Sequence, residues 1–205
     1  MTRLAWVLPV VAAGALAPVV VRAPRPERVR PEGVETIADA IRVCRASGLQ
    51  GWALVDRATV LVHDKFTKYS AWHLWEAPGE AFRNSRGYCN QYNLALAEVL
   101  RGLGFDVTVV HAARVRMGSG RPWWHSGHAW LRVTHEGRVL DVCASSASNR
   151  AGVVGFTPVT DPRPFTRLTQ LDTPLASVPF VVWTVWDAWR SGRDVPSWLF
   201  RDFDA

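Results

Sequence analysis

Residues 85–104 read SRGYCNQYNLALAEVLRGLG, and the fold of the chain is decided there. The apolar side chains of this stretch recur at spacings of three and four, which places them on one face of a helix with 3.6 residues per turn. They are Tyr92, Leu96, Val99, Leu100 and Leu103. Gly104 is the residue type that most often ends a helix in a left-handed conformation. The stretch therefore predicts an amphipathic helix that begins near Cys89.

Cys89 falls in the first turn of this predicted helix. Unpaired backbone N–H groups and the positive end of the helix dipole favour a thiolate over a thiol at such a position. A cysteine can equally be a small core residue, and this stretch alone leaves both interpretations open.

The composition is that of one globular domain of 205 residues, with 48% apolar and 20% charged residues. The net charge of +6 comes mainly from arginines that are spread along the chain. No basic run or stripe of the nucleic-acid type is present, so nucleic acid is not an expected partner. The eleven tryptophans suggest a flat apolar cleft or membrane contact as much as a core.

The three cysteines, Cys44, Cys89 and Cys143, form no CxxC pair. This sparse, odd set argues against a disulfide framework and against a zinc site built on thiolates. Cys44 lies on the apolar face of a predicted helix and is interpreted as a core thiol. Free thiols fit a reducing compartment, which favours a cytoplasmic domain over a secreted one.

An uncharged segment at residues 4–21 would span about 27 Å as a helix, close to the thickness of a bilayer core. Three interpretations stay open for it: a cleaved signal peptide, a retained membrane anchor with the domain in the cytoplasm, or an apolar arm packed on the domain. Residues 22–33 hold prolines among charges and are predicted to be a linker. We therefore separate residues 1–33 from a single domain at 34–205.

Within that domain the pattern predicts an α+β fold, with N-terminal helices packed on an antiparallel sheet. The predicted helices cover residues 34–44 and 52–66, which form a helical hairpin, a short segment after Pro78, the segment from Cys89, and residues 180–189. A strand is predicted at 105–110 and a hairpin at 126–143 that turns at Glu136-Gly137. Residues 145–178 are predicted to be loops with a short strand at 153–156. The core is expected at 52–144, with a C-terminal extension at 145–205.

Alternation along the predicted hairpin sorts its side chains onto two faces. One face, interpreted as the core face, carries Ala129, Leu131, Val133, Leu140 and Val142. The other carries His128, Trp130, Arg132, Asp141 and Cys143. With a two-residue turn, Asp141 lies opposite Arg132 and roughly 13 Å along the strand from His128. A bulge or a shifted turn would bring Asp141 to His128, and an ion pair with Arg132 is the alternative.

A thiol at a helix start, followed by a histidine and an aspartate on neighbouring strands, is the set needed for thiol nucleophilic catalysis. His128 would take the proton of Cys89, and Asp141 would fix the imidazole. The backbone N–H of Cys89 or Tyr88 could stabilise an oxyanion. His125 and His128 lack an evident third ligand, so no metal is expected. Substrate-binding candidates are Trp72, Trp75, Tyr88 and Trp130.

The motifs around these residues resemble those of the transglutaminase-like superfamily. Residues 86–89 (RGYC) with the helix that follows resemble its cysteine motif, and residues 127–130 (GHAW) and 140–142 (LDV) resemble its histidine and aspartate motifs, in the family's order. Arylamine N-acetyltransferases are the nearest named branch. The chain departs from their pattern by one missing glycine, by Gln91 in place of glutamate, and by Cys143-Ala144 in place of Gly-Phe. The resemblance covers about residues 52–144.

The resemblance implies a papain-like α+β core, with Cys89 as nucleophile, His128 as base and Asp141 as the residue that orients it. It implies acyl transfer through a thioester, with hydrolysis of a peptide, protein amide or isopeptide bond as the leading outcome. Acyl transfer to a small amine and processing of a leader peptide are the alternatives. No cofactor is expected, except acetyl-CoA if the chain is an acetyltransferase. A non-catalytic binding or scaffold module that keeps the fold also remains open, because of the register of Asp141.

Overall fold

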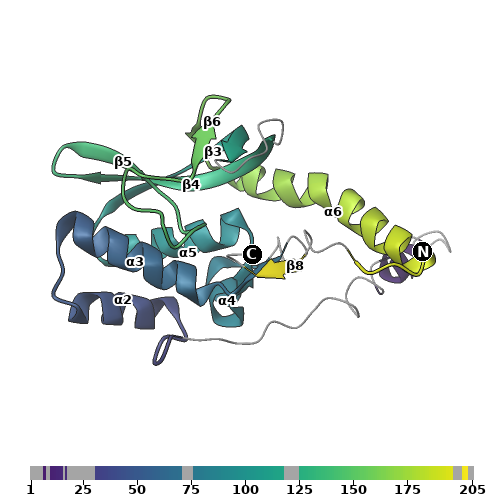
Figure 1. Ribbon diagram of the computed structural model, residues 1–205, viewed down its shortest axis with the longest axis horizontal. Coiled ribbons are helices and arrows are strands. Elements are labelled where there is room, and N and C mark those ends of the chain that lie inside the picture. Colours follow the sequence, from purple (N-terminus) through teal and green to yellow (C-terminus); the bar gives the residue numbers. More distant parts are fainter. Residues whose placement is uncertain are drawn as a thin grey trace.

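The computed structural model describes residues 7, 10–15, 17, 31–70, 76–117, 125–195 and 200–202. Helices lie below one face of an antiparallel sheet, and a long C-terminal helix runs diagonally away from the sheet (Figure 1). The helices are α2 (Ile37–Ala46), α3 (Gly51–Lys65), α4 (Pro78–Asn84), α5 (Cys89–Gly102) and α6 (Arg167–Arg190). The strands are β1 (Lys68–Ser70), β2 (Arg86–Gly87), β3 (Asp106–Met117), β4 (His125–His135), β5 (Arg138–Val142), β6 (Phe156–Pro158), β7 (Arg163–Pro164) and β8 (Phe200–Asp202). The predicted α+β class is confirmed.

Helix α5 is central to the core because most of its side chains are buried. Leu96, Val99 and Leu100 have no exposed surface and pack in one cluster with residues of α2, α3 and the sheet. The helical hairpin predicted at 34–66 is present as α2 and α3. Cys44 is fully buried in the same cluster, as its position on an apolar helix face indicated.

The large sheet has the order β5-β4-β3-β6, every neighbouring pair is antiparallel, and β7 also pairs with β3. Strands β4 and β5 form the predicted hairpin. Glu136 and Gly137 both have positive φ angles of 50° and 73°, as a two-residue turn that matches the strand twist requires. The small sheet has the order β2-β1-β8, and it holds the chain just before α5.

The sequence pattern assigned the core to one face of the hairpin, which would leave the face with Trp130 and Cys143 exposed to solvent. In the structure that second face is covered as well. Both residues have no exposed surface, because the chain after β5 returns over them and places Phe156 against Trp130 at 5.1 Å between ring centroids. The sheet is therefore buried on both faces near Trp130.

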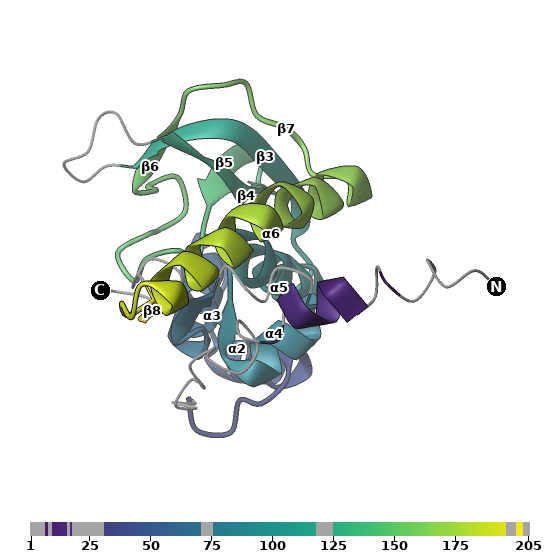
Figure 2. The same ribbon diagram turned by 90° about the vertical axis from the view of Figure 1, so that its right-hand side faces the viewer.

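Helix α6 begins at Arg167, so the loop predicted up to residue 178 is wrong over its last part. Thr166 caps the helix by accepting a hydrogen bond from the backbone of Thr169, a start signal that the proline-rich composition hid. Trp186 of α6 donates to the carbonyl of Ala15 at 2.8 Å, which links the helical residues 10–15 (purple in Figure 2) to α6. Most of the segment 4–21 lies outside the described residues. Within those that are described, no helix is long and apolar enough to cross a membrane.

Candidate active site

The first turn of α5 lies against the free edge of β4, because β5 stops pairing with β4 at Leu131. Asn93 donates to the carbonyl of Ala129 at 2.7 Å, and the backbone of Ala129 also hydrogen-bonds the sulfur of Cys89. Cys89 and Asn93 are four residues apart and so share one face of the helix. Asn93 also accepts from the N–H of Ala144 at 3.1 Å. These bonds fix the thiol beside the residue that follows His128.

Close packing of side chains against the backbone of Gly87, two residues before Cys89, also fixes the position of Cys89. A Cβ atom on Gly87 would lie 2.8 Å from Cβ of Gln91 and 3.0 Å from the ring of Phe66, so only glycine fits there. The side-chain oxygen of Gln91 accepts from the N–H of Tyr88 at 3.0 Å. Gln91 is therefore a cap of the helix.

Strand β4 presents His128 beside a bulge in β3. The register between β3 and β4 shifts between Ala112, which faces His128, and Val115, which faces Ser126. Two residues of β3 thus stand opposite Gly127 alone, which increases the local twist of the pair. The imidazole Nε2 of His128 lies 3.3 Å from the sulfur of Cys143.

The structure does not bring Asp141 to His128. The β4–β5 register is regular and pairs Asp141 with Arg132, as the two-residue turn indicated. The carboxylate accepts from Nε1 of Trp130 at 2.9 Å and from Nε of Arg132 at 3.3 Å. The alternative of a cross-strand ion pair is therefore present, and a direct catalytic role for Asp141 stays a prediction.

Aromatic rings cover the imidazole of His128. Trp130 is stacked with it, at 6.2 Å between centroids and 14° between planes, and Phe156 meets it edge-on at 4.6 Å. His128 is 5% exposed and Cys89 is 3% exposed. In this conformation the site is closed, and the fully buried ring of Trp130 is not available to a substrate.

Burial dominates the ionisation of both groups. It raises the pKa of Cys89 to about 12, although backbone hydrogen bonds from Ala129, Asn90 and Cys89 itself oppose the change. Burial also lowers the pKa of His128 to about 3, and His111 adds to this effect. The expectation of a thiolate at Cys89 is therefore wrong for the closed conformation, because loss of water outweighs the helix terminus.

The other predicted site residues are less informative. Tyr88 is half-buried at the start of α5. Trp72 and Trp75 lie outside the described residues. Across the part of the chain that the structure describes, no group of three His, Cys, Asp or Glu side chains could hold a metal ion.

Three functional candidates escaped the sequence reasoning: Cys143, Asn90 and Phe156. The parity of the hairpin had already placed Cys143 on the face of His128, and that signal could have identified it. Asn90 is 2% exposed, and its Oδ1 lies 3.5 Å from the sulfur of Cys89. Its Nδ2 is buried without a hydrogen-bond partner. Neither the side-chain direction of Asn90 nor the return of Phe156 has a sequence signal.

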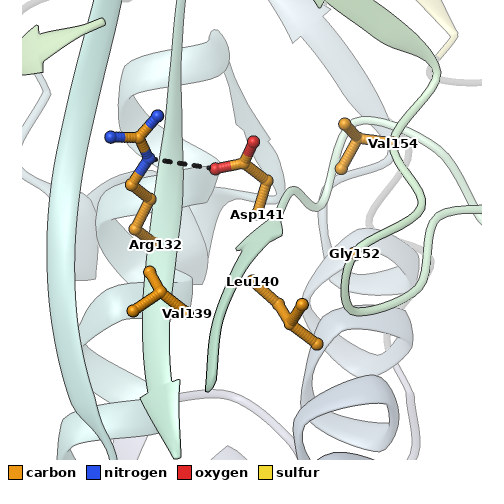
Figure 3. Close-up of a pocket in the computed structure, with 6 residues that line it drawn as sticks. All are labelled: Arg132, Val139, Leu140, Asp141, Gly152 and Val154. Atoms are coloured by element: carbon orange, nitrogen blue, oxygen red, sulfur yellow. Dashed lines mark hydrogen bonds and ion pairs between the residues drawn. The ribbon is translucent and has the colours of Figure 1, made fainter. Parts of the chain in front are cut away.

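An open depression of about 480 Å³ lies on the hairpin beside the buried site. Arg132 and Asp141 line it together with Leu140 and Val154, and the two charged groups point toward each other and form an ion pair at its wall (Figure 3). Asp141 connects this depression to the buried site through its hydrogen bond with Trp130.

Replacing Phe156 with alanine is expected to open the site. Water would then reach His128, so the pKa of its imidazole should rise from about 3 towards 6.5, and Cys89 should react with iodoacetamide at least ~10-fold faster. Peptide mapping after timed alkylation measures the rate at each cysteine.

Because loss of a buried phenylalanine costs about 3–5 kcal/mol, Phe156→Leu serves as the matched variant that keeps an apolar cover. Faster labelling of Cys44 as well as Cys89 would indicate general unfolding and contradict the prediction.

A family model described as N-acetyltransferase matches residues 81–144, which contain Cys89, His128 and Asp141. The match confirms the resemblance predicted from the motifs, and it covers about a third of the chain. The chain also aligns with a solved structure of a proposed cysteine protease from Cytophaga hutchinsonii, at 11% identity and a TM-score of 0.41. That alignment covers 72% of this chain and 55% of the other, so this chain spans about half the length of that protein. No curated protein matches the sequence.

Proposed function

We propose that the chain is a cysteine-dependent acyl-transfer enzyme in which Cys89 is the nucleophile and His128 the general base. One observation carries the proposal: Asn93, one helical turn after Cys89 on α5, donates to the carbonyl of Ala129, the residue next to His128 on β4, at 2.7 Å. We infer from this packing that the thiol at the start of α5 pairs with the imidazole on the neighbouring strand, within the segment that matches the family model. This is the pairing that nucleophilic thiol catalysis needs.

In the proposed reaction, His128 takes the proton of the Cys89 thiol as the sulfur attacks the carbonyl carbon of the acyl donor. The tetrahedral intermediate collapses with cleavage of the bond to the leaving group, which receives the proton from the imidazolium. The product is a thioester on Cys89. An amine or water then attacks this thioester, loses a proton to His128, and releases the acyl group as the sulfur recovers its proton.

The neutral state of both groups in the closed site shapes this mechanism. A thiol with a pKa of about 12 is almost fully protonated at neutral pH, so the reaction needs a base at the moment of attack. A histidine with a pKa of about 3 is neutral at the same pH, so its ring has a lone pair for the proton, and entry of water into the site would raise that pKa and make it a stronger base.

Asn90 is the best-placed side chain to stabilise the oxyanion of the intermediate. Its amide adjoins the nucleophile, and its Nδ2 is buried without a partner, which is costly unless a ligand or intermediate uses it. The N–H groups at the start of α5 are further donors, because a helix leaves its first N–H groups unpaired. Such donors stabilise the transition state more than the substrate.

Transfer of the acyl group to an amine is the outcome that the family match favours, with a thioester such as acetyl-CoA as the donor. Hydrolysis of an amide or isopeptide bond, including cleavage of a leader peptide, is the second candidate. It uses the same thioester and differs only in the attacking nucleophile. A non-catalytic module with the same fold is the third.

Trapping of an acyl-enzyme tests the proposal. The full chain is incubated separately with acetyl-CoA and with a peptide bearing a reactive ester, and the modified residue is located by mass spectrometry. We expect one acyl group on Cys89, none in the Cys89→Ala variant, and an unchanged yield in Cys44→Ala, which removes a buried thiol on α2.

Addition of an arylamine or of water alone then separates transfer from hydrolysis. An acyl group on Cys89 that never forms with either donor, while the protein is folded, would favour the non-catalytic module and reject the proposal.

A further inference from the structure

We infer that Cys143, and not Asp141, is the positioning residue that holds the imidazole of His128 in the tautomer that a general base requires. The inference rests on the proposed function for its catalytic meaning. The contact itself stands on geometry, because the Cys143 sulfur is the hydrogen-bond partner of Nε2 at 3.3 Å.

The other bonds of Cys143 indicate which atom carries the proton. The thiol donates to the hydroxyl of Ser145 at 3.2 Å, and the sulfur accepts from the amide of Asn93 at 3.4 Å. A thiol has one hydrogen, so with that hydrogen on Ser145 the sulfur is an acceptor for His128. Nε2 of His128 then carries the ring proton, and Nδ1 keeps its lone pair. In the proposed reaction, Nδ1 is therefore the ring nitrogen that acts as the base.

The backbone places Cys143 there for identifiable reasons. Leu131 and Val142 form the last pair of β4 and β5, so the next residue, Cys143, lies on the face that carries His128 and Trp130. Asn149, which is 2% exposed, donates to the carbonyl of Cys143 at 3.0 Å and to the hydroxyl of Ser145 at 3.2 Å. The loop after β5 is therefore held in shape around the thiol.

The same loop also carries the aromatic cover. The N–H of Gly155 donates to Oδ1 of Asn149 at 3.1 Å. The next residue, Phe156, packs edge-on against the ring of His128. One buried amide therefore ties together the residue that holds Nε2 and the residue that closes the site. Cys143 has no exposed surface, so its contact with the imidazole is shielded from solvent.

Asp141 acts on His128 only indirectly, through Trp130. Its carboxylate holds the indole of Trp130, and the indole is stacked with the imidazole. This arrangement limits the tilt of the ring and leaves the choice of tautomer to the atom bonded to Nε2. Burial raises the pKa of Cys143, so this partner stays a neutral thiol and supplies no charge to stabilise an imidazolium.

The experiment measures the tautomer of His128 by nitrogen NMR in the full chain labelled on histidine. We expect the Nε2–H form in the wild type and in Asp141→Asn, and a mixture of both tautomers in Cys143→Ala. Cys143→Ser, which keeps a small hydrogen-bonding group in the buried position, should restore the Nε2–H form. Cys44→Ala is the matched control for removal of a buried thiol.

Kinetics give the second readout. Acylation of Cys89 should slow by about 10-fold in Cys143→Ala, with no change in apparent affinity for the donor, and recover in Cys143→Ser. In Cys143→Asp a carboxylate replaces the neutral thiol, so the pKa of His128 should rise and the lower limb of the pH–rate profile should move to higher pH.

Three results would overturn the inference: an Nδ1–H tautomer in the wild type, a tautomer that depends on Asp141 but not on Cys143, or an acyl group trapped on Cys143 itself. Failure of the proposed function is distinguishable from these. If Cys89 accepts no acyl group but the tautomer still depends on Cys143, the positioning contact holds and the enzymatic proposal falls.

Discussion

The His128→Gln variant is expected to acylate Cys89 about 100- to 10,000-fold more slowly than the wild type, the range that loss of a general base produces. The reason lies in the buried thiol, whose pKa of about 12 leaves almost no thiolate at neutral pH. Glutamine fills much of the space of the imidazole and can hydrogen-bond to Cys143, but it accepts no proton. Single-turnover acylation, followed by intact-protein mass spectrometry, measures the rate.

His135→Gln is the matched control, since it makes the same change seven residues further along β4. That side chain contacts Trp52 and Phe105, at the end of β4 opposite to His128. We expect it to change acylation less than threefold. Equal slowing in the two variants would mean that the loss comes from the strand and not from a base at His128.

The elements that the sequence predicted well are those with a local signal. The helix from Cys89 follows from the spacing of its apolar residues, and the β4–β5 hairpin follows from alternation on either side of Glu136-Gly137. Even the unfavourable register of Asp141 against Arg132 was predictable, because a two-residue turn leaves only one way to pair the strands.

The contacts that define the candidate site depend on where strands end, and this has no local signal. Cys143 meets His128 because β5 stops after Val142 and the chain turns over the sheet. Asn93 bridges Ala129 and Ala144 only because the same ending leaves an open edge on β4. The periodicity of the sequence predicts the face of the element on which a residue lies, but it does not predict which residues of other elements pack against that face.

The ionisation of Cys89 also depends on tertiary structure that has no local signal in the sequence. Its place at a helix start predicts a lowered pKa, and the backbone hydrogen bonds that would lower it are present. The opposite result arises because Cys89 is only 3% exposed, and the loss of water around its thiol outweighs those bonds. Burial is a property of the whole fold, and it decides the ionisation here.

Acidification from pH 7 to pH 4 is expected to destabilise the folded protein by about 3 kcal/mol through His128 alone. Burial lowers the pKa of this imidazole to about 3, whereas in the unfolded chain it lies near the model value of 6.5. Between these values the unfolded state binds a proton that the folded state does not. Stability is therefore retained above pH 6.5 and is lost as the pH falls, by about 1.4 kcal/mol per pH unit until pH 3.

Urea unfolding at several pH values, in the wild type and in His128→Gln, isolates this contribution. Both proteins contain the same carboxylates, including Asp39, whose pKa is held low by hydrogen bonds with Thr36 and Arg42, so their effects cancel in the difference. The free energy of unfolding of the wild type should fall relative to the variant on acidification. A difference that is independent of pH would mean that His128 is hydrated in solution, and the closed site would then not be the dominant state.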